Sequence, residues 1–200
     1  IAMSNMFDLV QSSVQKGLVA ILEHRSVLDE VSNNERQVNT ISNGISKNLM
    51  LIMSSNMNMQ ESKQVSMLFK TNIDMERMSD HAVNIAEAGN KLIESDLSFS
   101  VDTYDDLENL SKIVVESFNA LNNIINTGDS SFFKLIENNE KLIDELCAKY
   151  RDTEIERMSE DKKESKAGVI YSEMLIDIER VGDHIMNVAE SLCESYEGQF

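Results

Sequence analysis

Pairs of carboxylates at helical spacing are the residues of this sequence most suited to chemistry. Glu76 and Asp80 lie four residues apart, and so do Glu179 and Asp183. Residues four apart share one face of a helix, so the two acids of each pair should project together. Partly buried carboxylates need a cation or hydrogen-bond donors beside them. Their oxygens suit hard cations such as magnesium, calcium, manganese or ferric iron, so each pair is half of a candidate metal site.

A second helix offers matching groups to each pair. Glu35 and Asn39 stand at equivalent places to Glu140 and Asp144, in segments that share an acid, an aliphatic residue, an Asn or Asp, and a second aliphatic residue. The second half therefore has four acids available, whereas the first has three and an asparagine. We expect the stronger site in the second half. The predicted metal ligands are Glu140, Asp144, Glu179 and Asp183 in that half, and Glu35, Glu76 and Asp80 in the first.

The same residues also have plain structural interpretations. In a chain with 35 acids, a pair of carboxylates one turn apart is most often a solvated helix face. Arg77 and Arg180 each follow a motif glutamate and are interpreted as interhelical salt bridges. His81 and His184 are expected to border the core or bond a neighbouring carboxylate more often than to bind metal.

The acids belong to a string that occurs twice. Residues 73–87 read IDMERMSDHAVNIAE and residues 176–190 read IDIERVGDHIMNVAE, with nine of fifteen positions identical at an offset of 103 residues. Such a repeat at half the length of the chain indicates an internal duplication. We therefore predict two halves, residues 1–97 and 98–200.

Composition predicts an all-α fold. The chain has no Pro and 7 Gly, and lacks runs rich in β-branched or aromatic residues. Apolar residues at helical spacing predict three helices in each half, packed as two tandem antiparallel three-helix bundles. The expected helices run approximately over 6–28, 30–53, 59–94, 104–126, 130–158 and 166–196, with the last two joined by a charged turn at 159–165.

Local signals refine these helices. Asn58 followed by Glu61 resembles a capping box that should start the third helix, and Asp102 with Asp105 is a start signal for the fourth. Ser79 and Gly182 are interpreted as small residues at a close helix crossing. Beside the motif acids we expect an apolar stripe in each copy: Met75, Met78, Ala82 and Ile85 in the first, and Ile178, Val181, Ile185 and Ala189 in the second.

Charge and composition restrict the partners. The formal net charge is −17, which excludes nucleic acid as a favoured partner and leaves cations or a basic protein surface. No apolar run approaches the ~20 residues of a membrane span, and no signal peptide is visible. Cys147 and Cys193 have no metal-binding spacing and suggest reduced thiols in a cytoplasmic protein.

The repeated string resembles the motif of the PhoU family of phosphate-transport regulators. Glu-Arg-x-x-Asp-His with a trailing Asn-x-Ala-Glu occurs on the third helix of each half, and the resemblance covers essentially the whole chain. Phe99-Ser100 and Gly168-Val169-Ile170-Tyr171 are similar to the PhoU-like region at the C-terminal end of bacterial sodium/phosphate cotransporters. A start at Ile1 leads us to expect a domain cut from such a membrane protein.

The resemblance implies a cytoplasmic, non-enzymatic regulatory module at the inner face of the membrane. It implies multinuclear metal clusters at the acid-x-x-x-Asp pairs, with iron, zinc, manganese or magnesium as candidate metals. It also implies a protein partner in phosphate transport, either the transporter's own membrane domain or another protein, and leaves a homodimer open.

Three alternatives stay open. The chain could be a free-standing PhoU-type regulator of a phosphate ABC transporter, or a metal-free helical interaction module. A di-iron carboxylate enzyme would need Glu-x-x-His on two helices, but Met78 and Val181 stand three residues before the two histidines.

Overall fold

The computed structural model describes residues 2–160 and 165–197, which form helices and the turns between them. The all-α prediction is confirmed. Along the described residues, six α-helices and one 3₁₀ turn follow one another: α1 (Ala2–Leu22), α2 (Leu28–Met53), α3 (Met59–Glu94), α4 (Val101–Thr127), η1 (Ser130–Phe132), α5 (Phe133–Glu160) and α6 (Ser165–Glu197). No helix in the described ranges is both long enough and apolar enough to cross a bilayer.

Caps explain where the helices begin and end. At the start of α3, the Asn58 side chain accepts from the Glu61 amide and the Glu61 carboxylate accepts from the Asn58 amide, both at 2.9 Å, as the sequence predicted. The start of α4 was predicted wrongly, because Ser100 and not Asp102 caps it, at 3.2 Å from the Thr103 amide. The end of α4 at Gly128 has a φ of 70°, a left-handed conformation that glycine adopts without strain.

Two boundaries differ from the predicted ones. The first helix ends at Leu22 and not near residue 28, because Glu23 and His24 form a turn and His24 has a φ of 51°. Of the predicted charged turn 159–165, residues 161–164 lie outside the described part of the chain, while residues 159, 160 and 165 are helical.

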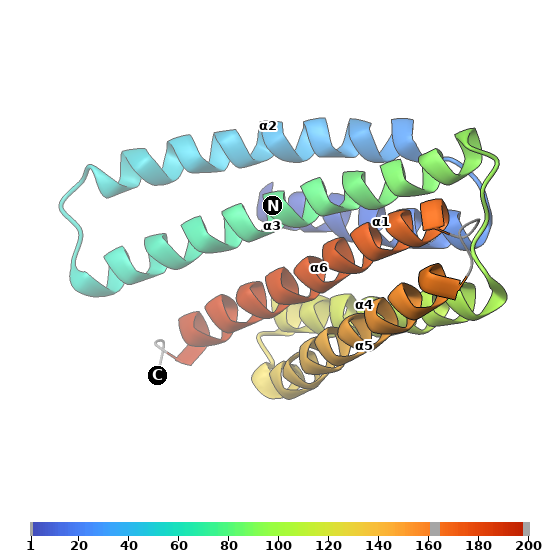
Figure 1. The fold of residues 1–200 in the computed structure, drawn as a ribbon. Coiled ribbons are helices and arrows are strands. Elements are labelled where there is room, and N and C mark those ends of the chain that lie inside the picture. The colour runs from blue at the N-terminus through green and yellow to red at the C-terminus, as the bar shows by residue number, and fades with distance from the viewer. Residues whose placement is uncertain (1, 161–164, 198–200) are drawn as a thin grey trace.

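The two halves meet along α3 and α6. These helices run antiparallel side by side through the middle of the molecule, and α1 and α4 also contact each other across the halves (Figure 1). The apolar stripes that the sequence predicted beside the motif acids are buried, and they join one continuous core. These are Met75, Met78, Ala82 and Ile85 on α3, and Ile178, Val181, Ile185 and Ala189 on α6. The polar residues of both motifs therefore lie at the edge of this shared core.

Small residues allow the motif helices to pack closely. A Cβ added at Gly182 would lie 3.3 Å from Cδ1 of Ile143 on α5, and Ser79 on α3 is wholly buried. The predicted role of Gly182 at a close helix crossing is consistent with this contact.

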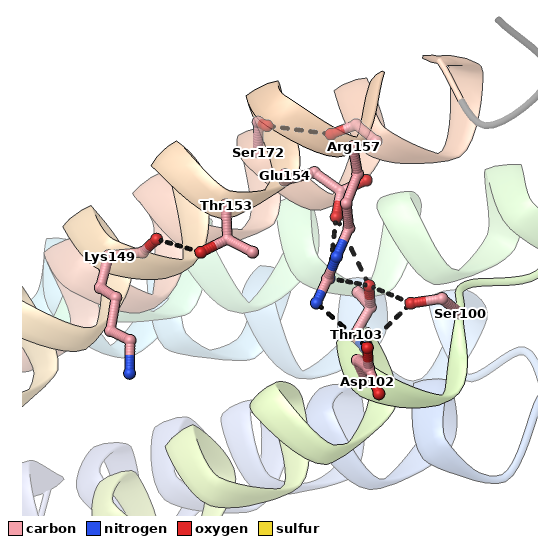
Figure 2. A network of polar contacts seen from close by, with 9 residues as sticks. Ser100, Asp102, Thr103, Lys149, Thr153, Glu154, Arg157 and Ser172 are labelled. Carbon is pink, nitrogen blue, oxygen red and sulfur yellow. Dashed lines mark hydrogen bonds and ion pairs between the residues drawn. The ribbon is translucent and has the colours of Figure 1, made fainter. Parts of the chain in front are cut away.

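A polar network ties the connection between the halves to the end of α5 (Figure 2). Arg157 donates to Oγ1 of Thr103 at 3.2 Å and pairs with Glu154 and Asp102 at 3.4 Å each. Ser100 and Thr103 share a hydroxyl hydrogen bond of 2.9 Å. The Glu154 side chain is only 6% exposed, so the Arg157 guanidinium supplies the positive charge that a buried carboxylate needs.

Candidate metal centre

Three carboxylates converge between α5 and α6. Glu140 and Asp144 lie one turn apart on α5, and Asp183 approaches them from α6. One oxygen from each lies within 4.8 Å of the others, and this is the one such cluster among the described residues. All three residues are partly exposed, so a cation could reach them. Three of the four acids predicted for the second half are thus brought together.

Glu179, the fourth predicted ligand, lies outside this cluster. Its carboxylate accepts a hydrogen bond from Nη2 of Arg151, on the next turns of α5, at 3.0 Å. The interpretation of Arg180 as an interhelical salt bridge is wrong, because Arg180 pairs with Asp183 on its own helix at 2.9 Å. Residues three apart on one helix meet more easily than residues on two helices. Glu179 as a ligand stays a prediction.

The electrostatics of the cluster favour a bound cation. Burial, followed by the neighbouring carboxylates of Glu140, Asp183 and Glu179, raises the pKa of Asp144 to about 6. Burial and the charge of Asp183 raise the pKa of Glu140 as well. In addition, Oδ1 of Asp144 is buried without a hydrogen-bond partner. An orphaned carboxylate oxygen among like charges fits a hard divalent or trivalent cation, so the residues present suit the metal that the sequence predicted.

The first half lacks an equivalent three-carboxylate cluster in the described part of the chain. Glu35 on α2 is bonded by the side-chain amide of Asn39, which stands where Asp144 stands in the second half. On α3, burial raises the pKa of Glu76 and of Asp80, and the nearby Glu35 charge adds to both. In the first half, the amide of Asn39 thus stands in place of one carboxylate and donates to Glu35. A weaker or empty first site stays a prediction.

The motif histidines lie together at the contact of α3 and α6. The rings of His81 and His184 stack with centroids 5.6 Å apart and an angle of 25° between their planes. Nδ1 of His81 donates to Asp177 at 2.7 Å, and Nδ1 of His184 donates to Asp74 at 2.8 Å. The expectation that these histidines bond neighbouring carboxylates is confirmed, with the acid in each case on the opposite half.

The motif asparagines donate hydrogen bonds to the same two aspartates. Asn84 donates to Asp177 at 2.9 Å, and Asn187 donates to Asp74 at 3.4 Å. The first aspartate of each motif therefore receives the histidine and the asparagine of the other motif. Sequence reasoning assigned no role to Asp74 and Asp177, although their identity in both copies was the signal that could have shown one.

A cavity of about 750 Å³ is lined both by acids of the carboxylate cluster and by the two stacked histidines. Asp80 and His81 line it from α3, Asp183 and His184 from α6, and Glu140 from α5. One acid from the first predicted site and two from the second thus face the same space. The two predicted metal sites are neighbours across the contact between the halves.

Comparison with known proteins agrees with the motif and the fold. The family model described as PhoU domain matches residues 3–89 and again residues 107–192. The chain is 25% identical over 174 residues to the phosphate-specific transport system accessory protein PhoU homolog 1 of Thermotoga maritima, covering 86% of this chain and 69% of that protein. It is 23% identical to the PhoU homolog of Deinococcus radiodurans, covering 93% of this chain and 87% of that protein.

Solved structures show the same fold. The crystal structure of PhoU from Pseudomonas aeruginosa superposes with a TM-score of 0.91 at 20% identity, covering 98% of this chain and 94% of that one. PhoU from Streptococcus pneumoniae superposes with a TM-score of 0.83 at 20% identity, covering 98% and 92%. A duplicated motif, two three-helix halves and a family match in each half lead to one conclusion: the chain belongs to the PhoU domain family.

Proposed function

We propose that this protein is an accessory regulator of a phosphate transport system, which acts by contacting a protein of that system and catalyses no reaction itself. The observation that carries the proposal is the match of the PhoU family model to both halves of the chain. Two curated relatives with that accessory role in their names cover 86% and 93% of the chain. They favour the free-standing regulator over the cotransporter domain that the sequence first suggested.

A metal ion at Glu140, Asp144 and Asp183 is part of the proposal. When bound there, a hard cation would supply positive charge to three carboxylates that otherwise repel one another. Asp183 belongs to α6, which carries the histidine pair, and the two acids Glu140 and Asp144 belong to α5. Holding these acids together would therefore fix α6 against α5 beside the contact of the two halves.

The place of action follows from the same role. A protein that contacts a phosphate transport system would work in the cytoplasm at the inner face of the membrane. The two cysteines are buried and form no disulfide with each other, as expected for a reducing compartment. Burial also raises the pKa of the Cys147 thiol to about 12, which disfavours its nucleophilic thiolate form.

Phosphate uptake in the source organism tests the function. We expect cells that lack the gene to take up radiolabelled phosphate at a rate that no longer responds to the phosphate supply, and we expect the restored gene to recover the response. Asp183→Asn in the restored gene should recover it only in part, whereas Asp8→Asn, at an exposed site far from the motifs in the sequence, should recover it fully. Unchanged regulation of uptake in the deletion strain would refute the proposed function.

A further inference from the structure

The turn between α2 and α3 exposes an unusual number of apolar side chains. Met50, Leu51, Ile52 and Met53 are 47–69% exposed around the whole last turn of α2, and Met59 at the start of α3 is 90% exposed. We call these five residues the apolar tip. The turn lies at the far end of the long α2–α3 hairpin, beyond the helices of the second half (Figure 1). Apolar side chains gathered at one protruding end indicate a contact surface.

The surroundings of the apolar tip carry almost no charge. Residues 37–60 contain a single charged side chain, Lys47, in a chain with 35 acidic and 18 basic residues. The rest of the molecule therefore carries a formal charge of −18, which the single positive charge of Lys47 reduces to −17 for the whole chain. A partner that receives the tip needs an uncharged apolar cleft, and the acidic body behind the tip is attracted to a basic border around that cleft.

The fold itself does not require an apolar turn at this place. By the internal duplication, the corresponding connection in the second half is the one between α5 and α6, whose residues 159–166 read SEDKKESK. The first-half connection, residues 54–58, reads SSNMN and is uncharged, whereas the second-half connection is densely charged. Glu35 and Glu140 stand at equivalent places, so the apolar residues 50–53 (MLIM) correspond to residues 155–158, which read IERM and carry two charges. The sequence of this connection therefore differs between the halves, although both halves share the same arrangement of three helices.

We propose that the apolar tip docks into an apolar cleft with a basic border on a protein of the same phosphate transport system. This inference rests on the proposed function. Methionine side chains are flexible and polarisable, so three of them can fill a cleft of irregular shape. A lipid surface suits the tip less well, because residues 37–60 contain no aromatic residue and one basic residue, whereas interfacial segments use several of both. A second copy of this chain would bring a second acidic body toward the first.

Binding measurements with a tip variant test the proposal. The full chain would be measured against each separately purified subunit of the source organism's phosphate transport system, including its signalling proteins, by biolayer interferometry. The tip variant is Leu51→Gln with Met59→Gln. The matched control is Val101→Gln with Ile155→Gln, which removes two apolar side chains that are 75% and 53% exposed on other helices. Circular dichroism would check that both variants fold.

We expect wild-type protein to bind one subunit, the tip variant to bind it about thirtyfold more weakly, and the control to bind as wild type does. Equal binding by the tip variant would overturn the docking inference but leave the proposed function intact. Phosphate uptake that depends on the gene, without binding to any subunit, would have the same meaning. Loss of flotation with phosphatidylethanolamine–phosphatidylglycerol vesicles, or of a homodimer, as the sole effect of the tip variant would also overturn it.

Discussion

The His81 ring stacks on the His184 ring at 5.6 Å, and each ring is held by an aspartate that belongs to the other half of the chain. The exchange is reciprocal: Asp177 holds His81 and Asn84, and Asp74 holds His184. The duplicated motif is therefore not two independent sites. It is one interlocked contact, in which each copy supplies the acceptor that the other copy needs.

Stability measurements should detect this interlock. Asp74→Ala leaves Nδ1 of His184 without its acceptor, and the His184 side chain is only 9% exposed. We expect the free energy of unfolding to fall by about 1–3 kcal/mol. Asp177→Ala should cost less, because the His81 side chain is 21% exposed and water can replace the lost carboxylate. Urea unfolding at pH 7.5 measures both.

Asp8→Ala removes an exposed aspartate of α1 and serves as the control. It should change the free energy of unfolding by less than about 0.5 kcal/mol. If Asp74→Ala were as mild as this control, the cross-motif hydrogen bonds would contribute nothing to the contact between the halves.

The sequence predicted the helices and their buried faces well, because both depend on local patterns. Apolar residues at helical spacing located the stripes of α3 and α6, and Asn58 with Glu61 located the start of α3. The start of α4 was missed because Ser100 and Asp102 both suit a cap, and only the path of the chain decides between them.

The partners of the motif residues were harder to predict. Helical spacing shows that Asp74 and His81 lie near one face of the same helix, but their hydrogen bonds cross to α6. Those partners depend on the antiparallel contact of α3 with α6, which no local pattern encodes. In the same way, Arg151 of α5 reaches Glu179 because of how α5 packs on α6.

The metal cluster leads to an unequal ranking of its predicted ligands. Asp144→Asn and Asp183→Asn each remove an acid of the converging group, so we expect either to weaken binding of Mn²⁺ at pH 7.5 by at least about tenfold. Glu179→Gln removes an acid that Arg151 already occupies, and should weaken binding by less than about threefold. Isothermal titration calorimetry on chelator-treated protein measures all three.

Two results would contradict this ranking. Glu179→Gln could weaken binding as much as Asp144→Asn, which would place Glu179 in the metal site and require Arg151 to move away. Alternatively, wild-type protein could bind none of Mn²⁺, Fe³⁺, Zn²⁺ and Mg²⁺, which would favour a metal-free interaction module.

The raised pKa of Asp144 predicts a pH dependence of stability in metal-free protein. Its value of about 6 in the folded state lies above the ordinary 3.8, so the folded state binds the proton more tightly than the unfolded state does. The stabilising contribution is complete below pH 3.8 and is lost as the pH rises through about 6. As the pH rises from 5 to 7.5, deprotonation of Asp144 therefore lowers the free energy of unfolding of the metal-free protein.

Asp144→Asn should remove this contribution. We expect the variant to lose less stability than wild type does between pH 5 and pH 7.5, measured by urea unfolding in the presence of a chelator. Asp8→Asn should follow wild type at both pH values. A variant that shows the full wild-type loss would mean that Asp144 is not the group whose charge the metal-free fold disfavours.

The asparagine of the first half allows the site to be rebuilt. Asn39 stands where the second half has Asp144, and its amide bonds Glu35. Asn39→Asp would remove that donor and place a carboxylate beside Glu35. Burial and the Glu35 charge already raise the pKa of the nearby Asp80. We expect metal-free Asn39→Asp to be less stable than wild type at pH 7.5, because like charges then face one another without a donor.

With saturating Mn²⁺ we expect the Asn39→Asp variant to hold more bound metal per chain than wild type, measured by inductively coupled plasma mass spectrometry after gel filtration. The double variant with Asp144→Asn should keep the added metal if the first half binds it, and lose it if the second half does.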